Sequence, residues 1–457
     1  MSTDLSERLA ALADRATSTR SSAAGLGVPP AELWRRGRRR QVRRALAATV
    51  AVAAVSAIAG IGGATAWQRV ETVGPVTSPD DTMRLPDRLY NPGPWLEGTD
   101  EAGPIGPLVA VIGADRRSWR SRSNGLVGVS GTTGEYRFLD LPDVAILNGE
   151  FPSAPALSPD GTMLAYWTTG SSADDPLIPM RGDRPVAGVA VYDTVTGEVH
   201  RKAVVSDHGL APQGIAWSGD TVWANYFTFN EGGVEPGGYG STFGGELTWS
   251  PATEEWATQT DFARSLIADG AAIGTESFVT AASRGKGYVE VGPRGEVRRF
   301  RLDAKLAVPP YLSPSGKRVA GMGLPEDGDS QGQLLVAELP RSGTDGPVTT
   351  RQVPGVRGGA VLGWRDDTHV VVRSSAEDSH YVTVDVATGA TEPLVTPPAV
   401  NWTGGTTVAA DAWSGPVTDA PEPDWPMDPR TRALRLGLGV AAACVVLVLW
   451  RRRRDRA

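Results

Sequence analysis

The sequence has one cysteine, Cys444, and this scarcity excludes two common ways of stabilising a domain. A single thiol cannot form a disulfide within the chain, and it cannot build a zinc site from several cysteines. Histidine is almost as rare, with four residues in 457. The fold must therefore be stable through its hydrophobic core, and we expect neither a metal nor a cofactor.

Lysine is also scarce, because only four of the 45 basic residues are Lys and the rest are Arg. Together with abundant Ala, Gly and Val, this bias is typical of a GC-rich bacterial genome. The formal net charge of -7 hides an uneven distribution. Residues 1–44 hold ten Arg and four acids, and residues 451–457 hold five Arg and one acid, so residues 45–450 carry -17. We expect no nucleic-acid partner for this acidic central part.

Two apolar runs lie next to the basic ends of the chain. Residues 45–67 would span roughly 35 Å as a helix, which is enough for a hydrocarbon core of about 30 Å. Residues 433–450 are a shorter candidate. Clustered Arg stays on the cytoplasmic side of a membrane, so the sequence predicts two spans, both termini inside and residues 68–430 outside. A cleaved export signal is the alternative for the first run, since "ATA" at 64–66 fits a cleavage site.

A short phrase recurs in the middle of the chain. "LSPDGTMLAYW" at 157–167 and "LSPSGKRVAGMG" at 312–323 each combine a tight polar turn with a strand-like apolar run. Further strands and turns follow each relative of the phrase, which gives six copies of about 50 residues between about 106 and 396. Short β-rich runs at this period, with about four strands per unit, favour an all-β fold of the β-propeller type.

The two ends of this repeated region complement each other. Residues 399–413 begin another unit without its later strands, whereas the first copy lacks a clear innermost strand. Pairing the end with the beginning would complete one blade and remove an exposed edge. Six blades are therefore favoured, and seven would require strands from residues 83–100.

The "SPDG" turn at 158–161 resembles the repeat signature of TolB-like and WD-like propellers. This resemblance covers about 300 residues and implies the propeller fold. In the turn itself, Asp160 can hydrogen-bond to nearby backbone and Gly161 accepts the positive φ that the turn requires. We therefore expect the turn to have a structural role and not to bind a ligand.

These patterns predict seven segments. They are a basic cytoplasmic leader with a short amphipathic helix at 1–44, a transmembrane helix at 45–67, a linker and the start of the propeller at 68–105, the propeller at 106–414, an acidic Pro-rich linker at 415–432, a second transmembrane helix at 433–450 and a cytoplasmic Arg tail at 451–457.

No local catalytic motif occurs in the sequence. HExxH, GxSxG and a phosphate-binding Gly-rich loop are all absent. The chain is therefore predicted to be a non-enzymatic binding or sensor module. A Ser-His-Asp site can still assemble from distant residues, which keeps an exported propeller hydrolase or lyase as an alternative.

The predicted ligand site is the stretch "FTFNEGGVEPGGYGSTFGG" at 227–245, which is Gly-rich, aromatic and without a strand pattern. Long loops in compact domains are often binding segments. We expect four aromatic side chains of this loop to contact an unknown protein or small-molecule ligand: Phe227, Phe229, Tyr239 and Phe243.

The leader carries a second candidate interaction site. Asp4 and Glu7 have capping-box spacing, and Leu5, Leu9 and Leu12 share one helical face. A helix this short is marginal alone in water, so we expect it to dock on a partner or on the membrane. The layout resembles actinobacterial membrane proteins that accompany extracytoplasmic-function sigma factors. This resemblance implies an alternative function, an anti-sigma-factor-like regulator that binds a sigma factor through residues 1–44. The leader differs from zinc-containing anti-sigma factors in having no His or Cys.

Overall fold

The computed structural model describes residues 82–146, 153–178, 183–231, 239–261, 271–281, 287–324, 332–340, 346–374, 380–399 and 406–454. The chain divides into two compact units, one of residues 70–427 and one of residues 1–69 with 428–457. The predicted first membrane span at 45–67 and the leader, with Leu5, Leu9 and Leu12, lie outside the described residues.

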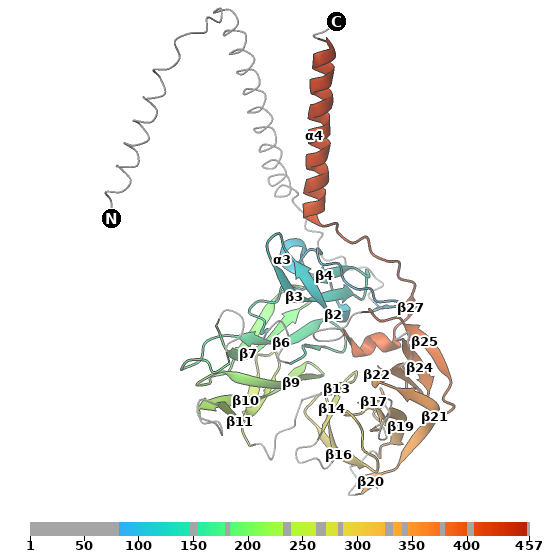
Figure 1. The fold of residues 1–457 in the computed structure, drawn as a ribbon. Coiled ribbons are helices and arrows are strands. Elements are labelled where there is room, and N and C mark those ends of the chain that lie inside the picture. The colour runs from blue at the N-terminus through green and yellow to red at the C-terminus, as the bar shows by residue number, and fades with distance from the viewer. Residues whose placement is uncertain are drawn as a thin grey trace, which may run out of the picture. The chain divides into compact units, whose positions relative to one another are not determined.

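Residues 82–427 form a six-bladed β-propeller, which Figure 1 shows as sheets arranged around one centre. The strands of each blade are given from the innermost outward. The first blade has β26 (Thr406–Val408), β2 (Leu108–Arg117), β3 (Arg122–Ser130) and β4 (Tyr136–Phe138), and the second has β5 (Ala156–Leu157), β6 (Met163–Thr169), β7 (Val186–Asp193) and β8 (Val199–Ala203). The third blade has β9 (Leu210–Ser218), β10 (Thr221–Glu231), β11 (Tyr239–Trp249) and β12 (Trp256–Gln259). The fourth blade has β13 (Ala272–Ile273), β14 (Phe278–Ala281), β15 (Tyr288–Val291) and β16 (Val297–Leu302), with β20 (Pro347–Val348) added at its edge. The fifth blade has β17 (Tyr311–Leu312), β18 (Arg318–Met322), β19 (Gly332–Glu338) and β21 (Thr350–Gly358). The sixth blade has β22 (Ala360–Trp364), β23 (His369–Arg373), β24 (Tyr381–Asp385) and β25 (Thr391–Val395).

The ring closes by pairing the end of the propeller with its beginning, as predicted. Strand β26 lies antiparallel to β2, with Ala110 opposite Val408 and Ile112 opposite Thr406. This pairing supplies the innermost strand of the first blade. A seventh blade is not formed in the described chain, because β1 (Leu85–Pro86) pairs in parallel with β27 (Val417–Thr418) in a separate two-stranded sheet.

The recurring "SPDG" turn packs one blade against the previous one. Gly161 has a φ of +72°, and a Cβ atom there would lie 2.1 Å from the carbonyl oxygen of Leu108. The Leu108 N–H donates to the Gly161 carbonyl oxygen at 2.8 Å. Asp160 accepts a hydrogen bond from the Thr162 N–H at 3.1 Å, which closes the turn. The turn therefore has the structural role that its residues predict.

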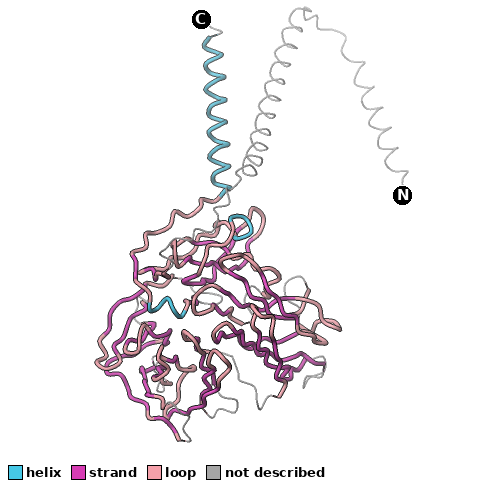
Figure 2. Tube along the Cα trace, turned by 180° about the vertical axis from the view of Figure 1, so that it is seen from behind, coloured by secondary structure: helices cyan, strands magenta, loops and turns pink. Residues whose placement is uncertain are grey.

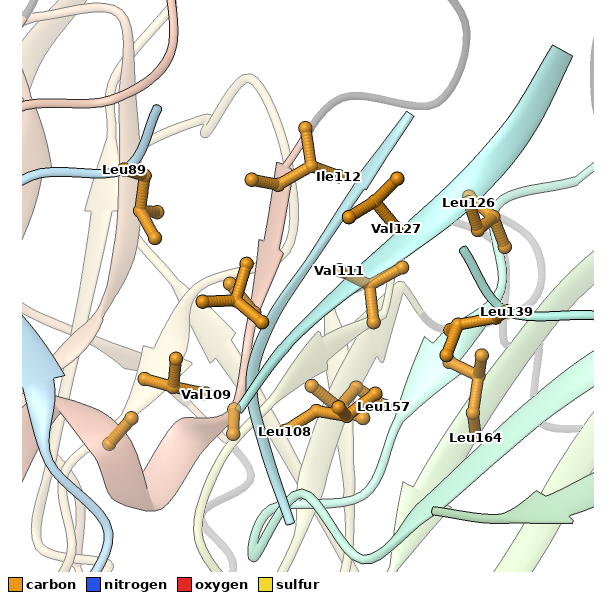
Figure 3. Close-up of a cluster of buried hydrophobic side chains, with 14 of the residues drawn as sticks. Leu89, Leu108, Val109, Val111, Ile112, Leu126, Val127, Leu139, Leu157 and Leu164 are labelled. Atoms are coloured by element: carbon orange, nitrogen blue, oxygen red, sulfur yellow. The ribbon is translucent and has the colours of Figure 1, made fainter. Parts of the chain in front are cut away.

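The hydrophobic core lies between the faces of neighbouring blades. Figure 3 shows part of it, where Leu108 and Val111 of β2 meet Leu157 and Leu164 of the second blade. All four side chains are buried, at 2 % exposed or less. Because alternate side chains of a strand point to opposite faces, each inner strand contributes to the contacts on both of its sides.

The prediction of an irregular loop at 227–245 is wrong. Residues up to Glu231 continue β10, and residues from Tyr239 begin β11, so the two strands form a long hairpin with Phe227 opposite Phe243. The alternation of Phe with Thr is a strand pattern, but several Gly residues, which are depleted in strands, obscure it. The pairing contains a register shift between Tyr226 and Phe227, as at a β-bulge.

Three short or separate elements complete the described chain. Helix α3 (Thr99–Ala102) precedes the first blade, and the 3₁₀ helix η1 (Ala410–Ser414) follows β26. Helix α4 (Pro429–Arg454) belongs to the other unit. Among the described helices, α4 is the one that is long and apolar enough to cross a membrane. Of the two predicted spans, the structure thus describes a candidate helix for the C-terminal one.

Candidate functional site

A cavity of about 450 Å³ lies at the axis of the propeller, enclosed by the innermost strands. Figure 2 shows the propeller from behind, with its strands in magenta arranged around the centre of the ring. Every blade contributes to the lining, from strands β26, β5, β9, β13, β17 and β22. The site is therefore assembled by closure of the ring and belongs to no single blade.

The described residues that line this cavity are all uncharged. Hydrogen-bonding side chains come from Gln213 on β9, Tyr311 on β17, Tyr381 on β24, and Thr406 and Thr407 on β26. The rest of the described lining is mainly apolar or small: Ser153, Ala154, Pro155, Ala156, Leu157, Gly214, Ile215, Ala271, Ile273, Leu362, Val408, Ala410 and Trp413. Such a lining can orient a ligand through hydrogen bonds, and it offers a charged ligand no ion-pair partner.

Both tyrosines of the cavity stay protonated at physiological pH. Burial raises the pKa of Tyr311 to about 12. Burial also raises the pKa of Tyr381, and this effect exceeds the opposing influence of Arg373 and of a hydrogen bond with Thr406. The two phenols therefore remain neutral hydroxyl groups, each able to donate and to accept a hydrogen bond.

Part of the cavity wall is the 3₁₀ helix η1. Its Trp413 is 2 % exposed and packs edge-on against Tyr381, with ring centroids 6.0 Å apart. A Cβ atom at Gly363 would lie 2.6 Å from the Trp413 ring, so this close approach requires glycine. Within η1, Ala410 and Trp413 line the cavity, whereas Asp411 lines a different groove.

This groove has a volume of about 330 Å³ and is called here the acidic groove. It lies at the turns that join β5 to β6, β9 to β10 and β13 to β14. Asp160, Asp220 and Asp411 line it, together with Thr275. Burial raises the pKa of the Asp411 carboxyl, and the nearby charges of Asp160 and Glu276 raise it further, although Thr275 donates a hydrogen bond that lowers it. The groove therefore holds a carboxyl that is harder to ionise than an ordinary one.

None of the four histidines is among the described residues that line the cavity or the acidic groove. His208 Nδ1 lies 2.9 Å from the carbonyl oxygen of Asp175, and His380 Nδ1 lies 3.4 Å from Thr396 Oγ1. Contacts with acids involve His200, 3.7 Å from Glu254, and His369, 2.8 Å from Asp366. The described cavity and groove therefore contain no Ser-His-Asp site.

The aromatic residues predicted to bind ligand lie on the β10–β11 hairpin, and they are not among the residues that line the cavity. The rings of Phe227 and Phe243 meet edge-on with centroids 5.8 Å apart. Phe229 lies two residues beyond Phe227 on the same strand, and its N–H donates to the Gly209 carbonyl oxygen at 3.2 Å. Tyr239 pairs with Glu231 at the start of β11. Their contact with a ligand remains a prediction.

Sequence reasoning missed the cavity residues, although the repeated phrase contained one signal. Ala156 and Tyr311 each immediately precede an "LSP" triplet, and both line the cavity. The position before this triplet therefore faces the axis in two blades. Nothing comparable marks Gln213 or Trp413, whose place depends on how the ring closes.

No protein-family model and no curated protein matches the chain. Among solved structures, TolB from Acinetobacter baumannii is similar at 14 % identity and a TM-score of 0.34, over 65 % of this chain and 69 % of that one. An acylaminoacyl peptidase from Pyrococcus horikoshii is similar at 14 % identity and a TM-score of 0.36, over 66 % of this chain and 47 % of that one. Hydrazine synthase from Kuenenia stuttgartiensis is similar at 10 % identity and a TM-score of 0.37, over 67 % of this chain and 48 % of that one. The chain thus spans about half the length of these two enzymes. The six-blade arrangement described above confirms the TolB-like propeller as a fold.

Proposed function

We propose that this chain is a membrane-anchored propeller that binds a small uncharged ligand in its central cavity. The observation that carries this proposal is the neutral, hydrogen-bonding lining of a cavity of about 450 Å³. Ligand pockets commonly measure about 300–1,000 Å³ and combine apolar walls with a few polar groups. Tyr and Trp present an apolar ring beside one polar atom, which suits a ligand that carries both hydroxyl groups and C–H faces, such as a sugar or polyol.

The membrane part of the proposal depends on α4. Its apolar stretch ends at Trp450 and is followed directly by Arg451–Arg454. Clustered Arg is retained on the cytoplasmic side, so a span at α4 would have its C-terminus inside and residues before Pro429 outside. The propeller would then meet its ligand outside the cytoplasm.

Titration of the full-length chain in detergent with trehalose, maltose and glucuronate tests the binding proposal. We expect at least one of the uncharged sugars to bind, and glucuronate to bind more weakly because the described lining offers its carboxylate no cation. Gln213→Leu keeps a similar volume and removes the amide, so it should weaken sugar binding at least tenfold. Gln352→Leu, on an exposed position of β21, is the matched control and should leave affinity unchanged.

Two outcomes of this titration would contradict the proposal. Sugar affinity that is the same in the Gln213→Leu variant and the unchanged chain would place the binding elsewhere. Preferred binding of glucuronate would contradict the neutral character of the site.

Hydrolysis is the second candidate function, and the acidic groove is the observation that favours it. A carboxyl whose pKa is raised by burial and by neighbouring acids is a frequent signature of acid–base catalysis. Asp411 fits that description, with Asp160 and Glu276 as the like charges. If the chain hydrolyses p-nitrophenyl glycosides or esters, Asp411→Asn should remove that activity while exposed Asp220→Asn reduces it less. Activity that survives Asp411→Asn would exclude Asp411 from the reaction.

A further inference from the structure

The C-terminal part of the propeller unit, residues 406–427, has two roles in the fold and is called here the C-terminal strap. At its inner end it contributes Thr406, Thr407, Val408, Ala410 and Trp413 to the wall of the central cavity. After its outer end, the chain continues into α4, which begins at Pro429. The strap is therefore the stretch of chain that connects the proposed ligand site to the membrane candidate.

The inner end of the strap is held deep in the propeller. Ala409 and Ala412 are completely buried, and Trp413 is 2 % exposed. The Ala409 N–H donates to the Val109 carbonyl oxygen at 3.0 Å, and the Asp411 N–H donates to the Pro159 carbonyl oxygen at 3.0 Å. A ligand in the cavity would thus touch a segment that is itself bonded to two blades.

The outer end is held by the segment that precedes the first blade. The Leu85 N–H donates to the Pro416 carbonyl oxygen at 3.0 Å, within the β1–β27 pairing. Further along, the Tyr90 hydroxyl donates to the Ala420 carbonyl oxygen at 2.8 Å. Trp425 then packs edge-on against a core tyrosine of the first blade, Tyr136, with ring centroids 5.4 Å apart.

The connection between the two ends of the strap is short. Only Ser414, Gly415 and Pro416 separate Trp413 of η1 from β27. Gly415 is the one glycine of the strap, and a Cβ atom there would lie 2.7 Å from the Met83 carbonyl oxygen, so the backbone approaches Met83 too closely for a side chain. The strap also contains four prolines, which restrict φ and stiffen an extended chain. With so few residues between them, we expect a displacement of Trp413 to shift the β27 segment as well.

We propose that the strap moves as one unit and couples occupancy of the central cavity to the C-terminal connection at Met427. This inference rests on the proposed function for its ligand, but the mechanical coupling is a property of the strap itself. A ligand that contacts the strap in its docked position stabilises that position by mass action. Coupling between sites is reciprocal, so loosening the outer end must also loosen the cavity wall.

Hydrogen exchange of the full-length chain, followed by mass spectrometry, tests the coupling in both directions. Trp425→Leu removes the outer ring contact, and we expect amides of residues 406–413 to exchange at least fivefold faster. Trp413→Phe loosens the inner end with a small loss of volume, and amides of residues 417–425 should then exchange faster by a similar factor. Trp256→Leu, at a Trp that is 55 % exposed on the outer strand of the third blade, is the matched control and should change neither segment.

The outcomes separate this inference from the proposed function. If Trp425→Leu accelerates exchange only around Tyr90 and leaves residues 406–413 unchanged, the strap is not one unit and the inference is wrong. If the titrated sugar binds but does not slow exchange at residues 417–425, ligand coupling is wrong while the binding proposal stands. If no sugar binds but both Trp variants act reciprocally, the strap coupling stands and the proposed ligand class is wrong.

Discussion

Glycine at a left-handed position costs different amounts to replace, depending on what surrounds it. Gly161 has a φ of +72° and would bring a Cβ atom 2.1 Å from the Leu108 carbonyl oxygen, whereas Gly134 has a φ of +74° with nothing within 4 Å of that position. A non-glycine residue in this conformation costs about 1–2 kcal/mol for backbone strain alone. We expect Gly134→Ala to lose about that much unfolding free energy and Gly161→Ala to lose about 3 kcal/mol or more, because the blade contact must also shift. Urea unfolding of both variants measures the difference, and equal losses would show that the contact between the blades is not tight.

The carboxyl of Asp411 is expected to make the unfolding free energy depend on pH. Its folded-state pKa is raised from 3.8, first by burial and then by the charges of Asp160 and Glu276, so the ionised form destabilises the fold. The penalty is absent below pH 3.8, grows as the pH rises through the folded pKa, and is complete above it. Asp411→Asn should therefore raise the unfolding free energy at pH 7 and leave it unchanged in acid. Unfolding curves at several pH values check this, with exposed Asp220→Asn as control. A gain that persists in acid would point to a cause other than charge.

At the scale of elements, the recurring turn was easier to predict than the hairpin of the third blade. The "SPDG" residues act within a few positions of each other, through an Asp side chain and a positive-φ Gly, so their structure is local. The β10–β11 hairpin depends instead on pairing between residues far apart in sequence, from Glu231 with Tyr239 to Val222 with Trp249, which are 27 positions apart. Its Gly residues have a weak strand preference, so the local sequence does not predict the strands. They form because the two segments pair with each other.

A double-mutant cycle on Phe227 and Phe243 measures how much the contact between their rings stabilises the hairpin. Edge-on aromatic pairs contribute about 0.5–1.5 kcal/mol beyond burial, so the double Ala variant should lose less stability than the two single variants together by about that amount. Phe227→Ala combined with Trp119→Ala, at an exposed position in the first blade, should be additive. Additive losses for Phe227 and Phe243 as well would show that the contact between their rings contributes no stability.

At the scale of the whole molecule, the predicted topology depends on charge at the ends of the chain, and labelling can test it. Cys444 is the single cysteine, so Cys444→Ala provides a background free of thiols. In that background, Val205→Cys lies at a position that is 94 % exposed on the propeller, whereas Arg453→Cys lies in the Arg tail. We expect a membrane-impermeant maleimide to label intact cells at position 205 and to label position 453 only after lysis. Labelling at 453 in intact cells would reverse the orientation.

The sequence by itself determined the ring. Turn chemistry and strand alternation are local properties, and their recurrence at a period of about 50 residues predicts blades, while the incomplete units at the two ends predict the β26–β2 closure. Only the tertiary structure decided the site, because Gln213, Tyr311 and Trp413 are far apart in sequence and meet after closure brings six inner strands to one axis. The strap also required three dimensions, since the docking of residues 417–420 on a segment more than 300 positions earlier leaves no periodic signal in the chain.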